Sequence, residues 1–540
     1  MSESGLQIPV LDLAIIIAYM LGILAVGVLS TRNIKLTGEV YFLAGRSLGW
    51  VMIGAALFAS NISTIHLVGL AASGYNEGIV WGNFEWAASF TLVILALVFA
   101  PFYYRNRIAT LPEFLERRFS PGARSFLAFM AILGALFMHI GMSLYAGATV
   151  FEQFFGINVI ASIVIISVIT GIYTVLGGLK AVVITEAIQT VLLIGGSILV
   201  TILAVMALPE HGITTMAEFK AALKPQQLSM IWSDNSAGLA WWSVLLGYPV
   251  LGIWYWCTDQ TIVQRVLAAK SEHDAQLGPL FAGFIKILPI FILVLPGTIG
   301  YALYHDQLGD NANQVLPFLI QELVPTGLKG LISAGLLAAL MSTIAAALNS
   351  CATLFAVDIV GRIRPQTSDQ AQVRIGQISA VVIMLLAMLW STQGERFASI
   401  FEGVQKIGAA LAPPMTTVFV WGVFWRRGTH QGALAALIFG CSLGCVTFVV
   451  DNFIGETMLL TQDWGIPFMM QAFYATMLCS IVFVVVSLMT PPPPPEKIDG
   501  LTWESPLAVL TNPYEGEGVD PRNVAAVLIA VMAVLYFFFR

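Results

Sequence analysis

The sequence predicts an all-α membrane protein that crosses the bilayer many times, and three observations predict it. Hydrophobic residues make up 58% of the 540 residues and charged residues only 10%, which is too apolar for a set of soluble domains. Fourteen segments are long enough, at about 20 apolar residues each, to cross a bilayer as helices. No region between them could form a soluble domain, so we expect a single transmembrane domain over 1–540.

The spans follow from the apolar runs taken in order. Gly177 and Gly178 separate two of these runs and permit a tight turn between them. The linker that opens with five prolines at Pro491 should be extended. The expected spans are 10–30, 48–75, a run around Glu85, 126–154, 158–176, 181–207, a run that begins at Leu239, 275–304, 327–360, 371–392, 397–425, 430–455, 464–490 and 522–539.

The basic residues are sorted by side, so the net charge of −6 says little about partners. In the fourteen-span arrangement, 18 of the 25 lysines and arginines, Arg265 among them, fall on the side that the first loop reaches. The positive-inside rule makes that side cytoplasmic and places both termini outside the cell membrane. Short loops without a glycosylation sequon on the outer side favour a bacterial inner membrane. The five cysteines lie in apolar runs without CxxC spacing, which indicates neither a disulfide framework nor a metal site.

One stretch breaks the helical pattern, from Leu251 to Arg265 (LGIWYWCTDQTIVQR). The aromatic triplet of Trp254, Tyr255 and Trp256 turns abruptly polar at Thr258, so we expect the helix to fail here. Backbone freed at membrane depth must face protein or a water-filled cavity, because lipid cannot satisfy it. The rings are the kind of surface on which a sugar stacks. The alternative is an aromatic belt at the membrane interface.

A second interruption occurs in the span 48–75, where SNISTIH places polar groups near the middle of an apolar run. This interruption lies five spans before the stretch 251–265, and the two spans cross the membrane in opposite directions. Corresponding breaks in oppositely oriented halves indicate a transporter built from inverted repeats, with its solute at mid-membrane. The repeats would be 48–207 and 239–425, with 10–30 and 430–540 peripheral.

Polar residues inside the spans supply the chemistry that a neutral, polyhydroxylated solute needs, namely many hydrogen-bond donors and acceptors without net charge. A buried charge is costly unless paired, and Glu85 and Lys286 could offset one another. Alternatives are hydrogen bonding between helices for Asn61 and His66, interfacial exposure for Glu85, and snorkelling for Lys286. The candidate solute residues are Asn61, His66, Glu85, Lys286 and Gln405, with Tyr255 or Trp256 as the stacking face.

A sodium ion could bind neutral oxygens between the same helices. Ser342 and Thr343 offer adjacent hydroxyls, and Ala59 and Ile62 could offer carbonyls at the first break. The alternative is that this polar stripe only joins helices. Glu186, about one turn into the span 181–207, is expected at a solvated helix start. His139 is expected to be a packing or hydrogen-bonding residue.

No feature of the sequence indicates an enzyme. We find no nucleotide-binding loop, no metal cluster and no nucleophile paired with a base. We therefore expect no organic cofactor and no nucleic-acid partner, with sodium as a co-transported ion and the bilayer as surroundings. A monomer would suffice.

Several motifs resemble those of a known family. These are YFLAGRSL, SNIS followed by His66, GNFEW, YTVLGGLKAVVITE, WYWCTDQTIVQRVLAAK, LNSCATLFAVDI and IFEGVQKIGAALAPP. Together they are similar to the sodium/glucose cotransporters of the sodium/solute symporter family, which includes animal sodium/glucose cotransporters and bacterial sodium/galactose symporters. The resemblance covers 10–540 and implies fourteen helices around a leucine-transporter-type core of five plus five inverted-repeat helices.

The resemblance also implies roles for individual residues. Tyr255 would be the inner aromatic gate, and Phe84, Trp254 and Phe401 would line the cavity. The implied sugar contacts are Asn61, His66, Glu85, Trp256, Lys286 and Gln405. The implied sodium ligands are the backbone oxygens of Ala59, Ile62 and Ala339 with the hydroxyls of Ser342 and Thr343.

Two departures from the family pattern bear on the number of ions. Members that carry a second sodium ion use hydroxyls where this chain has Ala345 and Ala346, and an aspartate where it has Glu186. We therefore expect symport of one sodium ion with one monosaccharide, glucose or galactose, into the cell by alternating access. The alternatives are a symporter of another solute, such as inositol or a nucleoside, and a sugar sensor or sodium channel of the same fold.

Overall fold

The computed structural model describes residues 9–35, 37–234, 238–392, 400–453, 459–505, 508–511 and 518–540, without the side chains of 64, 153–155, 400–403 and 452–453. These residues form helices and connecting loops, and their only extended pairings are two isolated β-bridges. The α-helices are α1 (Val10–Leu29), α2 (Gly38–Leu43), α3 (Trp50–Asn61), α4 (Thr64–Asn76), α5 (Asn83–Ile94), α6 (Ala100–Arg105), α7 (Leu111–Arg118), α8 (Pro121–Gly134), α9 (Ser143–Phe155), α10 (Val159–Ala207), α11 (Met216–Ala221), α12 (Trp241–Gly252), α13 (Gln260–Leu267), α14 (Glu272–Ile285), α15 (Leu295–Leu308), α16 (Val315–Leu323), α17 (Leu328–Thr353), α18 (Gly361–Ile363), α19 (Asp369–Ser391), α20 (Ile400–Phe424), α21 (His430–Phe453), α22 (Phe468–Met489), α23 (Ala508–Thr511) and α24 (Pro521–Phe538).

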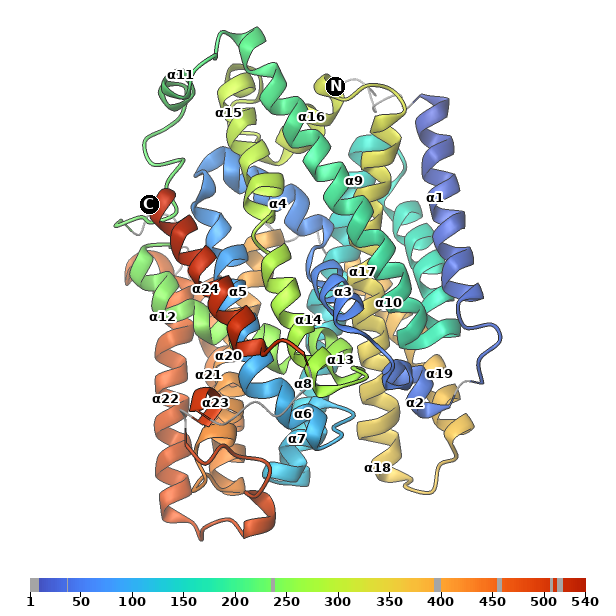
Figure 1. Ribbon diagram of the computed structural model, residues 1–540, viewed down its shortest axis with the longest axis vertical. Helices are drawn as coiled ribbons and strands as arrows, with labels where there is room; N and C mark the ends of the chain where they lie inside the picture. Colours follow the sequence, from blue (N-terminus) through green and yellow to red (C-terminus); the bar gives the residue numbers. More distant parts are fainter. Residues whose placement is uncertain are drawn as a thin grey trace.

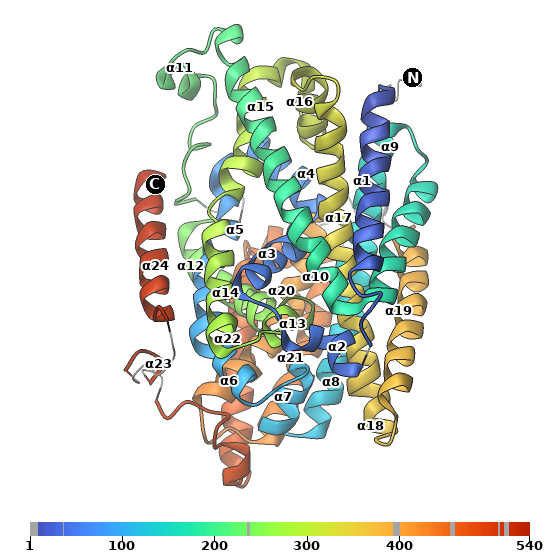
Figure 2. The same cartoon turned by 45° about the vertical axis from the view of Figure 1, so that its right-hand side comes forward.

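Short π-helical stretches continue several of these helices. They are η3 (Leu95–Phe99), η4 (Ala135–Met142), η6 (Ile253–Thr258), η7 (Ile290–Val294) and η9 (Leu354–Val360). The helices pack side by side into one elongated bundle, with α17 inside it and α1 and α24 at opposite edges (Figures 1 and 2).

Within the described residues, eleven helices are long and apolar enough to cross a membrane, or twelve when α3 and α4 count as one bent span. The sequence predicts fourteen spans, and the difference has two sources. The expected spans 158–176 and 181–207 both fall within α10, which continues to His211 as a single 53-residue helical segment. The expected span that begins at Leu239 divides into α12, η6 and α13, and its dense aromatic residues and its break lower its apolar character.

α10 bends sharply at Gly178, where the sequence predicts a turn. Gly178 has φ 59° and ψ −157°, a backbone conformation that L-residues with a side chain rarely adopt. A Cβ atom there would lie 2.5 Å from the carbonyl oxygen of Tyr41. Glycine therefore serves both the bend and the close approach of the α2 backbone.

The two expected helix breaks are present. α3 ends at Asn61, Ile62 and Ser63 are extended, and α4 leaves at 64° to α3. On the second broken helix, the π-helical turn η6 carries the aromatic triplet, and Asp259 (φ −83°, ψ 122°) separates it from α13. Each break releases backbone groups inside the bundle.

The halves of the broken helices on one side of the bundle are tied together by backbone. The amide of Leu48, just before α3, donates to the carbonyl of Ala268 at 3.1 Å, and the amide of Lys270 donates to the carbonyl of Leu48 at 3.0 Å. The guanidinium of Arg46 also donates to the carbonyl of Leu267 at 3.0 Å. α3 and α13 are therefore anchored to one another where they leave the bundle.

Two sequence expectations about charge are wrong. Glu186 is not at a solvated helix start, because its side chain is fully buried inside the bundle. Arg265, which the charge count assigns to a cytoplasmic loop, is also fully buried. α13 resumes immediately after the break and carries Arg265 back against α10, where the two residues form an ion pair. By contrast, the peripheral helices α1, α10, α19, α22 and α24 expose many large apolar side chains, as lipid-facing helices do.

Candidate solute and cation site

A cavity opens where the two helix breaks meet. Its lining comes from both broken helices and from α5, α17 and α20. We call it the solute cavity. Nine of the ten predicted solute residues line it, namely Asn61, His66, Phe84, Glu85, Trp254, Tyr255, Trp256, Lys286 and Gln405. The tenth, Phe401, lies in α20, and its side chain is outside the described residues.

Lys286 is the centre of a polar network in this cavity. Its ammonium group donates to Glu85 Oε2 at 2.5 Å and to Asn61 Oδ1. The amide of Asn61 in turn donates to the Tyr255 hydroxyl at 3.1 Å. Lys286 is buried, with an exposed fraction of 1%, so the interfacial alternative for this residue is excluded. The paired charges leave the wall neutral while offering donors and acceptors to a solute.

Aromatic rings form the wall on the side of the second break. The ring centroids of Tyr255 and Trp256 lie 5.1 Å apart at an interplanar angle of 79°. The Lys286 ammonium lies 5.3 Å from the Trp256 centroid, within cation–π range. Trp254 reaches across to α20, where a Cβ on Gly408 would lie 3.2 Å from the ring. The rings are fixed by their neighbours, so a stacking surface exists before a solute arrives.

His66 lines the cavity and also caps α4. The Ser63 amide donates to His66 Nδ1 at 3.3 Å, and the Ser63 hydroxyl lies 2.9 Å from the same nitrogen. The reciprocal pattern is a capping box in which histidine takes the place usually held by glutamate. Because Nδ1 accepts, the ring proton belongs on Nε2, where it can serve as a donor.

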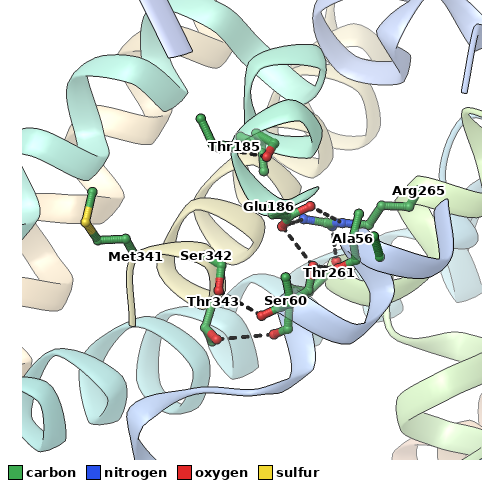
Figure 3. Close-up of polar contacts among 12 residues, drawn as sticks. Ala56, Ser60, Thr185, Glu186, Thr261, Arg265, Met341, Ser342 and Thr343 are labelled. Atoms are coloured by element: carbon green, nitrogen blue, oxygen red, sulfur yellow. Dashed lines mark hydrogen bonds and ion pairs between the residues drawn. The ribbon is translucent and has the colours of Figure 1, made fainter. Parts of the chain in front are cut away.

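Four of the five predicted sodium ligands come together between α3 and α17 (Figure 3). The Ser342 hydroxyl lies 2.8 Å from the Ala59 carbonyl and 2.9 Å from the Ala339 carbonyl. The Thr343 hydroxyl lies 3.2 Å from the Ala339 carbonyl and 3.2 Å from that of Ser60. Hydroxyl and carbonyl oxygens of this kind suit a hard cation without fixed charge.

Ile62 is the exception among the predicted sodium ligands. It closes α3 by donating its amide to the Phe58 carbonyl at 3.0 Å. The backbone oxygen that meets Thr343 belongs to Ser60 instead. Thr343 also lines the solute cavity, so the hydroxyl cluster and the cavity share a residue.

A sealed ion pair lies behind this hydroxyl cluster (Figure 3). Arg265 Nη2 donates to Glu186 Oε1 at 2.6 Å, and the Ser60 hydroxyl donates to the same oxygen at 2.8 Å. Arg265 also donates to the carbonyl of Thr261 within its own helix. The negative charge of Glu186 is thus compensated by a protein cation rather than left for a transported one.

The sequence analysis did not place two residues of this region at the site. The expectation that His139 packs or forms hydrogen bonds is confirmed, since it lies 3.1 Å from the Asp259 carboxylate, but His139 also lines the solute cavity. Asp259 belongs to the stretch that breaks the helix, but its own role was not assigned. A histidine in an apolar span and an acid at a helix break were signals that could have paired them.

A cavity at the crossing of two broken, apolar helices, with neutral oxygens beside it, defines a solute transporter. The comparisons with known proteins agree. The model of the sodium:solute symporter family matches residues 41–440, and the chain belongs to that family. The predictions of a membrane transporter with sodium as co-transported ion, and of no enzyme, are confirmed by this membership.

Similar proteins span nearly the whole chain. Sodium/glucose cotransporter 4 of Mus musculus is 34% identical, covering 97% of this chain and 82% of the relative. The sodium/mannose cotransporter of Bos taurus is 35% identical, with coverages of 98% and 96%. Sodium/myo-inositol cotransporter 2 of Mus musculus is 36% identical, with coverages of 91% and 79%.

Solved structures of transporters share the all-helical fold. A Na⁺-coupled sialic acid symporter superimposes with a TM-score of 0.74 at 22% identity, covering 90% of this chain and 99% of that one. A nucleobase-cation-symport-1 family transporter superimposes with a TM-score of 0.54 at 16% identity, covering 87% and 98%.

Proposed function

We propose that the protein carries one monosaccharide molecule, glucose or galactose, into the cell together with one sodium ion. The observation that carries the proposal is the solute cavity itself, where aromatic rings lie beside a charge-neutral network of donors and acceptors. A sugar ring offers an apolar face for stacking and hydroxyls for hydrogen bonding. Tyr255 would close the cavity on the cytoplasmic side, and sodium would bind the oxygens of Ala59, Ala339, Ser342 and Thr343, with Ser60 or Ile62 completing the set.

The buried ion pair supports a ratio of one. Arg265 already compensates Glu186, and alanine occupies positions 345 and 346. A second sodium ion would therefore meet neither an uncompensated carboxylate nor extra hydroxyls at this level of α17.

A cyclic polyol such as myo-inositol is the second candidate. Relatives named for glucose, mannose and myo-inositol are about equally similar to this chain. The cavity chemistry suits both, since both classes present hydroxyls around a six-membered ring.

We also propose the fourteen-helix topology with inverted repeats at 48–207 and 239–425. Counting the two arms of α10 separately, and α12 with η6 as one further span, adds two to the twelve spans. α1 begins and α24 ends in the half of the bundle opposite α7 and α18 (Figure 1), which supports termini on the outer side. Labelling of a cysteine placed in α11 from outside, and of one placed in α7 from inside, tests this orientation.

The deciding experiment is uptake into proteoliposomes of labelled glucose, galactose, mannose and myo-inositol, with a sodium or a potassium gradient. We expect one of the hexoses to accumulate, and only with the sodium gradient. We also expect one positive charge to move with each sugar molecule. Accumulation of inositol alone would replace the sugar assignment, and binding or current without accumulation would indicate a sensor or channel.

A matched pair of variants links the cation to its site. Thr343→Ala should raise the half-saturating sodium concentration about tenfold, because one oxygen ligand to a charged group is lost. Ser350→Ala, on the same helix, removes a buried hydroxyl that has no hydrogen-bond partner among the described residues and should leave sodium dependence unchanged. Equal sodium dependence in the two variants would contradict the site.

A further inference from the structure

A second cavity lies next to the solute cavity, and the residues that line it show toward which end of the bundle it lies. We call it the inner cavity. The residues that α8 contributes to the inner cavity come before His139, nearer the start of α8 beside α7. The residues that α20 contributes come after Gln405, nearer the end of α20. It therefore lies nearer than the solute cavity to the end of the bundle that holds α7 and the basic loops. Its lining includes Leu127, Met130, Thr258, Asp259, Leu411 and Met415.

The two cavities share a partition. Met138, His139 and Trp254 line both of them. A contact between side chains in this partition joins His139 Nε2 to Asp259 Oδ2 at 3.1 Å. Their side chains are 13% and 11% exposed, so the pair faces the cavities rather than being sealed in the core.

The His139–Asp259 pair also joins a continuous helix to a broken one. His139 lies in η4, inside a continuous rod formed by α8, η4 and α9. Asp259 lies at the break of the second broken helix and caps α13, since its Oδ1 accepts the Thr261 amide at 2.7 Å. Oδ2 is left for His139. A change at this break would therefore separate the two residues while the rod stays intact.

We propose that the His139–Asp259 pair is a latch that closes the passage from the solute cavity to the inner cavity. This rests on the proposed function, because it names the route by which the solute leaves toward the cytoplasm. The latch lies one turn beyond Tyr255, whose ring centroid is 6.0 Å from that of His139. Tyr255 covers the solute, and the latch holds the η4 rod to the helix that carries Tyr255.

The test measures opening directly, by the labelling of a cysteine in the inner cavity. Met130→Cys is the reporter, in a Cys445→Ser background, because Cys445 is the exposed one of the five native cysteines. An impermeant maleimide is applied to the cytoplasmic side of membrane vesicles that contain the full chain. Two variants break the latch from opposite sides, His139→Ala and Asp259→Ser. Serine keeps the α13 cap but is too short to reach His139.

We expect the labelling rate of Met130→Cys to rise about tenfold in each latch variant, the effect of losing one hydrogen bond to a charged group. His139→Gln, whose amide can still donate to Asp259, should restore labelling close to that of the unchanged latch. Labelling that stays the same in both His139→Ala and Asp259→Ser overturns the latch. Because labelling needs no transport, this result is distinct from a failure of sodium-driven uptake, which would overturn the proposed function.

Discussion

Two buried ion pairs contact neighbouring residues at the end of α3, Ser60 and Asn61, and they differ in what else they touch. Lys286 and Glu85 face the solute cavity, and their third partner is the side chain of Asn61, which a solute could replace. Arg265 and Glu186 are sealed, and their other partners are Ser60 and the backbone of Thr261. The difference teaches that burial and pairing alone do not identify a charged residue that binds solute. Such a residue also needs a hydrogen-bond partner that the solute can replace.

The sealed pair should give the largest effect. Glu186→Ala or Arg265→Ala leaves one charge buried without compensation, and we expect a loss of about 3–5 kcal/mol in the free energy of unfolding. The double variant Glu186→Leu with Arg265→Met should lose less than either single variant, since no charge remains. Thermal unfolding in detergent, followed by size-exclusion profiles, measures this. Single variants as stable as the wild type would contradict the distinction between the sealed pair and the cavity pair.

The cavity pair should give a large effect on transport instead of stability. Lys286→Met removes donors to Glu85 and Asn61, and we expect sodium-driven uptake to fall about 100-fold, as for the loss of roughly 3 kcal/mol of hydrogen bonding to charged groups. The fold should persist, because cavity water can solvate Glu85. The matched control is Arg105→Met, which breaks a more exposed pair with Glu272 and should leave uptake within twofold. Aggregation of the Lys286→Met protein would contradict this contrast.

Ser60→Ala tests the connection between the sealed pair and the cation site. It deletes the hydroxyl that donates to Glu186 but keeps the carbonyl that meets Thr343. We expect a stability loss of about 1–2 kcal/mol and an unchanged half-saturating solute concentration. The measurement combines thermal unfolding with concentration-dependent uptake. A large change in solute affinity at unchanged stability would argue against this assignment.

A surface carboxylate should give the smallest effect. Glu116 in α7 lies 2.6 Å from Arg124 and also pairs with Arg362. Partial burial acts to raise the pKa of the Glu116 carboxyl, but the two guanidinium groups outweigh it and lower that pKa. Its stabilisation is therefore present above the unfolded pKa of about 4.3 and is lost as the pH falls through the lowered folded value.

Glu116→Gln should accordingly cost about 0–1 kcal/mol at neutral pH. The difference from wild type should vanish in acid, below both pKa values. Unfolding measured at neutral pH and in acid checks this, and a difference that grows in acid would be the wrong sign.

Much of the site could be predicted from the sequence because its signals are local. Trp254–Trp256 and Asn61 stand out as polar or aromatic interruptions of apolar runs, and the structure places both at helix breaks. The pairing of Glu85 with Lys286 also followed, since two opposite charges in spans must find one another.

Other features depend on how distant segments pack, which no local pattern reveals. Arg265 looks like the end of a span because it follows a polar stretch, yet α13 carries it inward to Glu186. The carbonyl that meets the Thr343 hydroxyl is that of Ser60, and the packing of α3 against α17 determines which carbonyl of α3 lies there. The span count differs because the two helical arms of α10 meet at the non-helical residue Gly178 with no loop between them, so they count as one segment.

The separation in sequence between the partners has a consequence for how the chain is made. Asn61 meets Tyr255 194 residues later and Lys286 225 residues later. At about 5–20 residues per second, synthesis takes roughly 10–45 s to deliver those partners. During that time Asn61, in the polar middle of the first broken helix, lacks these two hydrogen-bonding partners. The machinery that inserts the chain, or water held beside it, must shelter that segment until the second broken helix arrives.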